Sequence, residues 1–345
     1  MRKALKKLFL VLLMIAVVLS LLTVIGAWGK KKSKAPKIAF FVSDLSNVFH
    51  QQQAAEAKKY AKEKYGADVY VFDGKSDVNV MIQNIDQIVA QGMDMASIHP
   101  WDSAKPGVMA ALDQNIICTS FFSPIADTGI PVVRSDEAGV SFEMGKQMAT
   151  QWKKAFPNKP IVMVQLGWPN HTEVKSGRTD PFVKGVLSVD PKATNLGCQD
   201  ASKGPDAAKQ IITDLVTQHP EVNIIYAEAS NLTVGVMAAL TQAGRGKFSN
   251  GKPITEIVCS VDFDPVEVKQ VYDPDSSLKL SMGLPPIETA RGRIDLLFDI
   301  KNGKVKQVTK PAKEFFYKAY TISYWTMKEA DAKQWLNIQF GANLK

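Results

Sequence analysis

Polar and aromatic side chains recur where the short apolar runs of this sequence end. Asn47, Phe49 and His50 follow the run at 37–44, and Asp262 follows the run at 257–261. Carboxylates and amides can hold the hydroxyl groups of a small molecule, while aromatic rings can stack on its flat apolar faces. We therefore expect a ligand site that also includes the residues found after the other runs: His99, Trp101, Asp102, Phe122, Asp136, Trp168 and Asn231.

Two other interpretations of these residues are weaker. A single ring could pack a loop against its own domain, but recurrence at successive run ends favours a ligand site. Asp44, Asp102, Asp136 and Asp262 could form an acid–base pair, yet the sequence has no phosphate-binding glycine loop, nucleophile elbow or zinc-binding HExxH. The four histidines are far apart. We expect a binding protein, not an enzyme, with no cofactor and no metal.

The positive charge of the chain is concentrated at its start. The formal net charge is +8, but residues 1–37 hold nine Lys or Arg and no acidic residue, so the remainder is close to neutral. A neutral body has no electrostatic attraction for a phosphate backbone. We therefore expect no nucleic-acid partner.

The first residues have the pattern of an export signal. A basic segment precedes the uncharged apolar run at 9–27, and small residues stand at Ala27 and Gly29. This pattern predicts a signal peptide at 1–29, cleaved after Gly29, followed by a basic linker at 30–36. The alternative is an uncleaved membrane anchor, because about 20 apolar residues can span a bilayer. Both interpretations place the remaining chain outside the cytoplasmic membrane.

Strand-like and helix-like segments alternate along the rest of the chain. We expect strands at 37–44, 68–73, 95–98, 116–122, 130–133, 160–166, 222–227, 257–261 and 278–283. We expect helices at 47–65, 80–90, 107–114, 141–156, 178–189, 207–218, 233–243, 266–272 and 287–300. This order predicts an α/β fold with parallel sheets covered by helices, divided into two lobes. Ligands of such sheets bind beyond the carboxyl ends of the strands.

Several short motifs, in order, resemble one family. They are Ser-Asn-Val-Phe at 46–49, Asp-Gly at 73–74, the helix segment at 84–92, His-Pro-Trp-Asp at 99–102, Ser-Asp at 135–136, the segment at 234–244, and Val-Asp at 261–262. Together they resemble the periplasmic sugar-binding proteins of ABC transporters, of the ribose and galactose type. The resemblance covers about residues 37–320.

The resemblance implies a type I periplasmic binding protein with two Rossmann-like lobes joined by three crossovers. Crossovers near Ser135, Leu284 and Thr309 would give a first lobe of 37–135 plus 285–309 and a second of 136–284 plus 310–345. The lobes would close on a sugar-like ligand and deliver it to an ABC permease. The alternative is a membrane-anchored sensor that presents the same lobes to a chemoreceptor or sensor kinase.

The resemblance also assigns residues. It places Asn47, Phe49, His99, Asp102, Asp136 and Asp262 at ligand-contacting positions, and it suggests Arg178 in place of an arginine usually found two residues earlier. Some polar contacts for a pentose are missing, because this chain has Phe122, Ala229 and Leu284 there. We therefore expect a larger, modified or less hydroxylated ligand, with a sugar derivative or polyol first and a nucleoside-like compound second.

Overall fold

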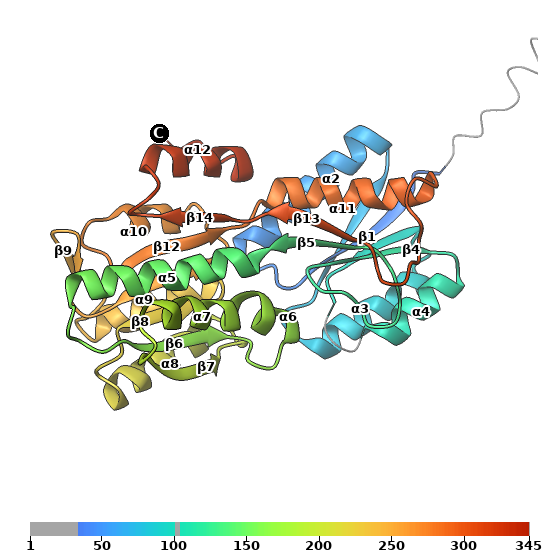
Figure 1. Cartoon of the computed structure of the whole chain (residues 1–345). Helices are drawn as coiled ribbons and strands as arrows, with labels where there is room; N and C mark the ends of the chain where they lie inside the picture. The colour runs from blue at the N-terminus through green and yellow to red at the C-terminus, as the bar shows by residue number, and fades with distance from the viewer. Residues whose placement is uncertain (1–33, 101–103, 345) are drawn as a thin grey trace, which may run out of the picture. The chain divides into compact units, whose positions relative to one another are not determined.

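The computed structural model describes residues 34–100 and 104–344. The signal peptide expected at 1–29 and most of the linker expected at 30–36 lie outside the described residues, as do Trp101 and Asp102. The described chain builds two six-stranded sheets (Figure 1). Among the described helices, none combines the length and the hydropathy that a membrane crossing requires.

The first sheet is parallel throughout and is covered by helices on both faces. Its strands are β1 (Lys37–Val42), β2 (Asp68–Asp73), β3 (Met95–Ile98), β4 (Ile117–Phe121), β5 (Val132–Asp136) and β13 (Glu314–Lys318). Its helices are α2 (Val48–Tyr65), α3 (Val78–Ala90), α4 (Lys105–Asp113) and α11 (Pro286–Lys301). The strand order is β13-β5-β4-β3-β1-β2.

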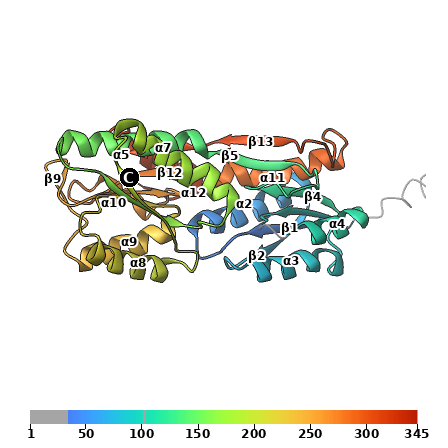
Figure 2. The ribbon, with the colours of Figure 1, turned by 60° about the horizontal axis from the view of Figure 1, so that its bottom comes forward.

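Side chains of the central strand β1 alternate between the two faces of this sheet, as the period of a strand requires. Ile38 and Phe40 pack with residues of α2 and α11, whereas Ala39 and Phe41 pack with residues of α3 and α4. The turned view shows these two helix layers on opposite sides of the strands (Figure 2). Burial on both faces explains why β1 is a continuous apolar run.

The second sheet has the order β14-β12-β11-β8-β6-β7. Its strands are β6 (Val162–Gly167), β7 (Thr194–Asp200), β8 (Ile224–Ala227), β11 (Ile257–Val261), β12 (Leu278–Gly283) and β14 (Tyr320–Ser323). Its helices are α5 (Glu137–Ala155) and α7 (Asp180–Val189) on one face, with α8 (Pro205–Gln218), α9 (Ser230–Gln242) and α10 (Glu267–Tyr272) on the other. The remaining elements are α6 (Thr172–Val174), a π-helix (Lys175–Thr179), β9 (Phe248–Ser249), β10 (Lys252–Pro253) and α12 (Glu329–Phe340).

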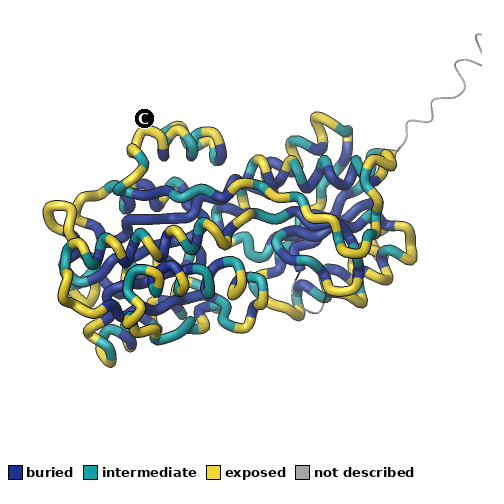
Figure 3. Tube along the Cα trace, in the orientation of Figure 1, coloured by how far each residue is buried: buried dark blue, intermediate teal, exposed yellow. Residues whose placement is uncertain are grey.

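The structure confirms the α/β class and adds elements that the sequence pattern did not predict. The longer ones are the edge strands β7, β13 and β14 and the helix α12, and the shorter ones are α6, β9 and β10. Both β7 and β13 are partly exposed along their length (Figure 3), so they lack the apolar runs that mark buried strands. β14 pairs antiparallel with β12, so the second sheet is mostly rather than wholly parallel.

The chain crosses between the sheets later than expected near Thr309. β13 pairs with β5 of the first sheet, and β14 pairs with β12 of the second. Only Ala319 separates these two strands. The segment 310–318, which we expected in the second lobe, therefore contributes a strand to the first sheet.

Candidate functional site

A cavity lies where residues that follow the strands of both sheets meet. Asn47 follows β1 and Phe122 follows β4, whereas Trp168 and Asp262 follow β6 and β11 of the second sheet. This position agrees with the rule that ligands of parallel sheets bind beyond the carboxyl ends of the strands. The structure gathers these predicted residues in its lining: Asn47, Phe49, His50, His99, Phe122, Trp168, Arg178, Asn231 and Asp262.

One predicted residue lies outside this cavity. Asp136, the last residue of β5, is exposed, whereas the next residue, Glu137, is buried and lines the cavity. The chain turns here from β5 into α5, and of these two neighbouring carboxylates Glu137 is the one that lines the cavity. Trp101 and Asp102 cannot be placed because they lie outside the described residues.

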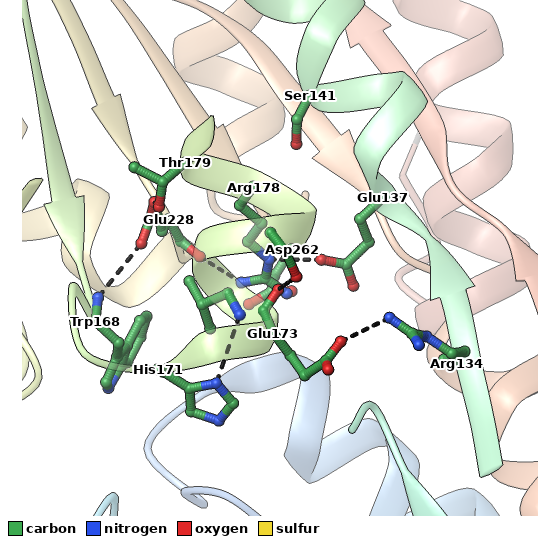
Figure 4. Close-up of polar contacts among 12 residues, drawn as sticks. Arg134, Glu137, Ser141, Trp168, His171, Glu173, Arg178, Thr179, Glu228 and Asp262 are labelled. Carbon is green, nitrogen blue, oxygen red and sulfur yellow. Dashed lines mark hydrogen bonds and ion pairs between the residues drawn. The ribbon is translucent and has the colours of Figure 1, made fainter. Parts of the chain in front are cut away.

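Arg178 is the centre of a buried cluster of charges. Its Nε donates to Glu137 Oε2 at 2.6 Å, and its Nη1 donates to the main-chain oxygen of Glu228 at 2.6 Å (Figure 4). Burial alone would lower the pKa of Arg178, but Glu137 and Asp262 offset this effect and raise it. Two carboxylates facing one guanidinium leave a negative charge that a ligand's hydroxyl groups could stabilise by donating hydrogen bonds.

Asp262 and Asn47 join the two sides of the cavity. Asn47 Nδ2 donates to Asp262 Oδ2 at 2.9 Å, while Asn47 Oδ1 caps α2 by accepting from the backbone N–H of Phe49 at 2.8 Å. Burial raises the pKa of Asp262 to about 6, although Arg178 and Asn47 oppose the shift. Asp262 is thus mostly ionised at neutral pH and can accept hydrogen bonds.

Three cavity residues have a left-handed backbone. The φ angles are 52° for Ser76, 72° for Phe122 and 69° for Asp262. This region is uncommon for residues other than glycine, and unusual for a bulky side chain. Such backbone strain is concentrated at binding and catalytic sites in proteins, where the surrounding structure holds it.

Aromatic rings form a continuous chain along the side of the first sheet. The His99 ring contacts the His50 ring edge-on, with 5.4 Å between the ring centres, and it stacks on the Phe122 ring, with 5.7 Å between the ring centres. The Arg178 guanidinium carbon lies 5.4 Å from the centre of the Phe122 ring, within the range of a cation–π interaction. Burial lowers the pKa of His50 to about 4 and that of His99 well below its usual value. Both imidazoles are therefore neutral at physiological pH, and each offers one donor and one acceptor.

Three polar atoms of the cavity lining have no partner in the described part of the chain. They are His99 Nδ1, Trp168 Nε1 and Asn231 Oδ1, all buried. Buried polar atoms are rarely left unpaired in native proteins. Together they offer hydrogen-bonding groups of both kinds, which suits a molecule that carries several hydroxyl groups.

Sequence reasoning missed some of the lining. Glu137, Phe121 and Ser135 stand beside predicted residues, so the strand-end rule located them to within one or two positions. Leu284 directly follows β12 and has no predicted site residue beside it. His171, which accepts from the backbone N–H of Val174, lies in the loop after β6 and carried no motif. The remaining lining residues are Ser43, Asp44, Ser76, Val174 and Ala229. Within the described ranges, no cluster of His, Cys, Asp and Glu could hold a metal ion.

Comparisons with known proteins agree with this architecture. A family model described as periplasmic binding protein domain matches residues 38–304. The ribose import binding protein RbsB of Escherichia coli (strain K12) is 24% identical over 211 residues, covering 60% of this chain and 69% of that protein. The corresponding protein of Bacillus subtilis (strain 168) is 22% identical over 234 residues, covering 63% of this chain and 71% of that protein.

Solved structures show the same fold at low identity. A galactofuranose binding protein has a TM-score of 0.71 and 19% identity, covering 90% of this chain and all of that one. A Caulobacter myo-inositol binding protein has a TM-score of 0.72 and 18% identity, covering 88% of this chain and 97% of that one.

Proposed function

Because the chain belongs to the periplasmic binding protein family, we propose that it captures a sugar-like molecule in the cavity between its two sheets and delivers it to an ABC importer. Members of this family are binding proteins that act outside the cytoplasmic membrane. Capture would occur by hinge closure of the two lobes around the ligand, without covalent chemistry.

The observation that carries this proposal is the set of unpaired buried polar atoms beside a charged cluster. His99 Nδ1, Trp168 Nε1 and Asn231 Oδ1 lack partners among the described residues, and the Arg178–Glu137 pair is already formed. A ligand can therefore bind without first breaking this ion pair. The flanking rings would cover its apolar faces.

We propose a sugar derivative or a polyol as the ligand, with a nucleoside-like ring compound second. Phe122, Ala229 and Leu284 supply no side-chain hydrogen bonds, so tight binding of free ribose is disfavoured. Proteins of similar fold have varied ligands: one similar structure is a galactofuranose binding protein, and another is a myo-inositol binding protein bound to myo-inositol.

A thermal-shift panel of D-ribose, D-galactose, myo-inositol and adenosine tests this proposal. A ligand that binds only the folded protein raises the melting temperature by mass action. We expect Asp262→Asn to reduce affinity for the best compound about ten- to a hundredfold, which is the cost of one charge-assisted hydrogen bond.

The matched control is Asp127→Asn. Asp127 also has a left-handed backbone, but it is exposed and pairs with Lys105 at the surface. We expect its binding to equal that of the wild type. Failure of every compound in the panel to raise the melting temperature would contradict the proposed ligand class, and equal binding by Asp262→Asn would remove Asp262 from the site.

We also propose that the leader is a cleaved signal peptide and that the mature protein begins near Lys30. The support is the basic start, the apolar run at 9–27 and the small residues at the expected cleavage point.

A further inference from the structure

A buried carboxylate lies behind the cavity wall. Glu228 directly follows β8, is fully buried, and is absent from the cavity lining. Its Oε2 accepts from the backbone N–H of Trp168 at 3.3 Å, and its main-chain oxygen accepts from Arg178 Nη1 at 2.6 Å (Figure 4). Glu228 thereby contacts two residues that line the cavity: Trp168 through its backbone N–H and Arg178 through its guanidinium group.

Local structure is arranged around this side chain. Arg178 and Thr179 are consecutive in the π-helix, a rare element often found at functional sites, and the Thr179 hydroxyl donates to Glu228 Oε1. Gly167 also makes room for this side chain, because a Cβ at Gly167 would collide with Glu228 Oε2. A glycine at the end of β6 is thus what allows the carboxylate to reach the backbone of Trp168.

We propose that Glu228 is a positioning residue that fixes Trp168 relative to Arg178, and that its charge state sets ligand affinity. This inference rests on ligand binding in the cavity described above. The carboxylate form accepts from Trp168 and Thr179 at the same time. Protonation of Oε1 reverses the bond with Thr179, and Oε2 then accepts more weakly from Trp168 because the carboxyl group has lost its charge. Protonation of Oε2 weakens the bond from Trp168 directly.

The ionisation of Glu228 falls in the physiological range. Burial raises its pKa to about 7, opposed by Thr179, Arg178 and the Trp168 backbone. The charged or titratable groups that face it in the described chain are Arg178 of the π-helix, Cys198 of β7 with Sγ 3.9 Å from Oε2, and Tyr226 of β8.

A second cavity, separate from the ligand cavity, is lined by two of the residues that contact Glu228. Thr179 and Cys198, which both contact Glu228, also line a second cavity of about 370 Å³ together with Gln165. This second cavity shares no lining residue with the first.

The first experiment measures affinity for D-ribose, D-galactose and myo-inositol by calorimetry between pH 6 and pH 8. Because the carboxylate form holds Trp168 and attracts Arg178, wild-type affinity should fall about tenfold as the pH drops through 7. Glu228→Gln should bind about tenfold more weakly at pH 8. Its affinity should no longer change near pH 7, and the remaining change with pH should be the one near pH 6 that the titration of Asp262 causes. An unchanged pH profile in this variant overturns the proposal.

The second experiment needs no ligand. The backbone amide of Trp168, followed by ¹⁵N NMR, should titrate near pH 7 in the wild type and not in Glu228→Gln. The proposal is overturned if the chemical shift of the Trp168 amide does not change with pH in the wild type, or if it changes in the same way in Glu228→Gln. If this titration is present but no sugar binds, the link between Glu228 and Trp168 stands and the proposed ligand class fails.

Two further variants separate positioning from folding. Glu256→Gln alters a buried carboxylate that precedes β11 and pairs with Arg245 away from the cavity, so it should lower stability and leave the Trp168 titration in place. Thr179→Val removes a donor to the charged form of Glu228. It should therefore move the midpoint of the Trp168 amide titration to higher pH. An unchanged midpoint would contradict the proposed contact, and this test remains available even if Glu228→Gln does not fold.

Discussion

At the scale of single residues, Asn47 shows how one side chain serves both fold and site. Its oxygen caps α2 and its nitrogen donates to Asp262. Asn47→Asp should keep the cap, since Asp caps helices as well as Asn does, but it would face Asp262 with a second carboxylate. We expect the free energy of unfolding to fall by about 1–3 kcal/mol at pH 8, measured by urea denaturation.

The loss in Asn47→Asp should be smaller at pH 5. Burial already raises the folded pKa of Asp262 above its unfolded value, so its charge lowers stability as the pH rises towards and through 6, and a second carboxylate strengthens this dependence. Asn47→Ser is the control, because it keeps a capping oxygen without adding a charge. Equal stability of Asn47→Asp and the wild type at pH 8 would show that the two side chains are not in contact.

At the scale of elements, α5 and α7 pack backbone to backbone through reciprocal glycines. A Cβ at Gly145 would collide with the Phe182 carbonyl, and one at Gly185 would collide with the Phe142 carbonyl. Gly185→Ala should therefore force the helices apart at a cost of about 1–3 kcal/mol, measured by thermal unfolding.

The same change should also weaken ligand binding. α5 begins at Glu137, and the π-helix that carries Arg178 leads directly into α7, so separating the helices stretches the Glu137–Arg178 ion pair. Gly139→Ala is a matched control on α5, because a Cβ there meets nothing within 4 Å and alanine favours a helix by up to about 1 kcal/mol. If Gly185→Ala were as stable as Gly139→Ala, the close packing would be refuted.

Strands and helices could be predicted from the sequence where burial requires a pattern of apolar residues. Strands such as β1 and β8 are buried on both faces and appear as apolar runs, whereas β7 and β13 lie at sheet edges and carry polar residues. The strand-end rule located the cavity but could not orient neighbouring side chains. It selected Asp136 instead of Glu137, and it passed over Glu228, because side-chain direction at a strand-to-helix turn depends on local backbone angles.

At the scale of the whole molecule, the leader proposal gives a direct measurement. We expect the intact mass of the exported protein to correspond to a chain that begins near Lys30. The small residues at Ala27 and Gly29 mark the expected cleavage point, and the lysines that follow would remain in the product. A mass that retains residues 1–29 would refute cleavage and favour the anchored alternative.

The pairing of β13 with β5 has a consequence for biosynthesis. Paired residues of these two strands are 182 positions apart in the chain, so the first sheet gains its edge strand only after nearly all of the polypeptide has been made. Folds that depend on such distant pairings form slowly. The first sheet is therefore incomplete until residues 314–318 have been synthesised, and we expect the full chain to refold more slowly than a chain of equal length whose strands pair with their neighbours in sequence.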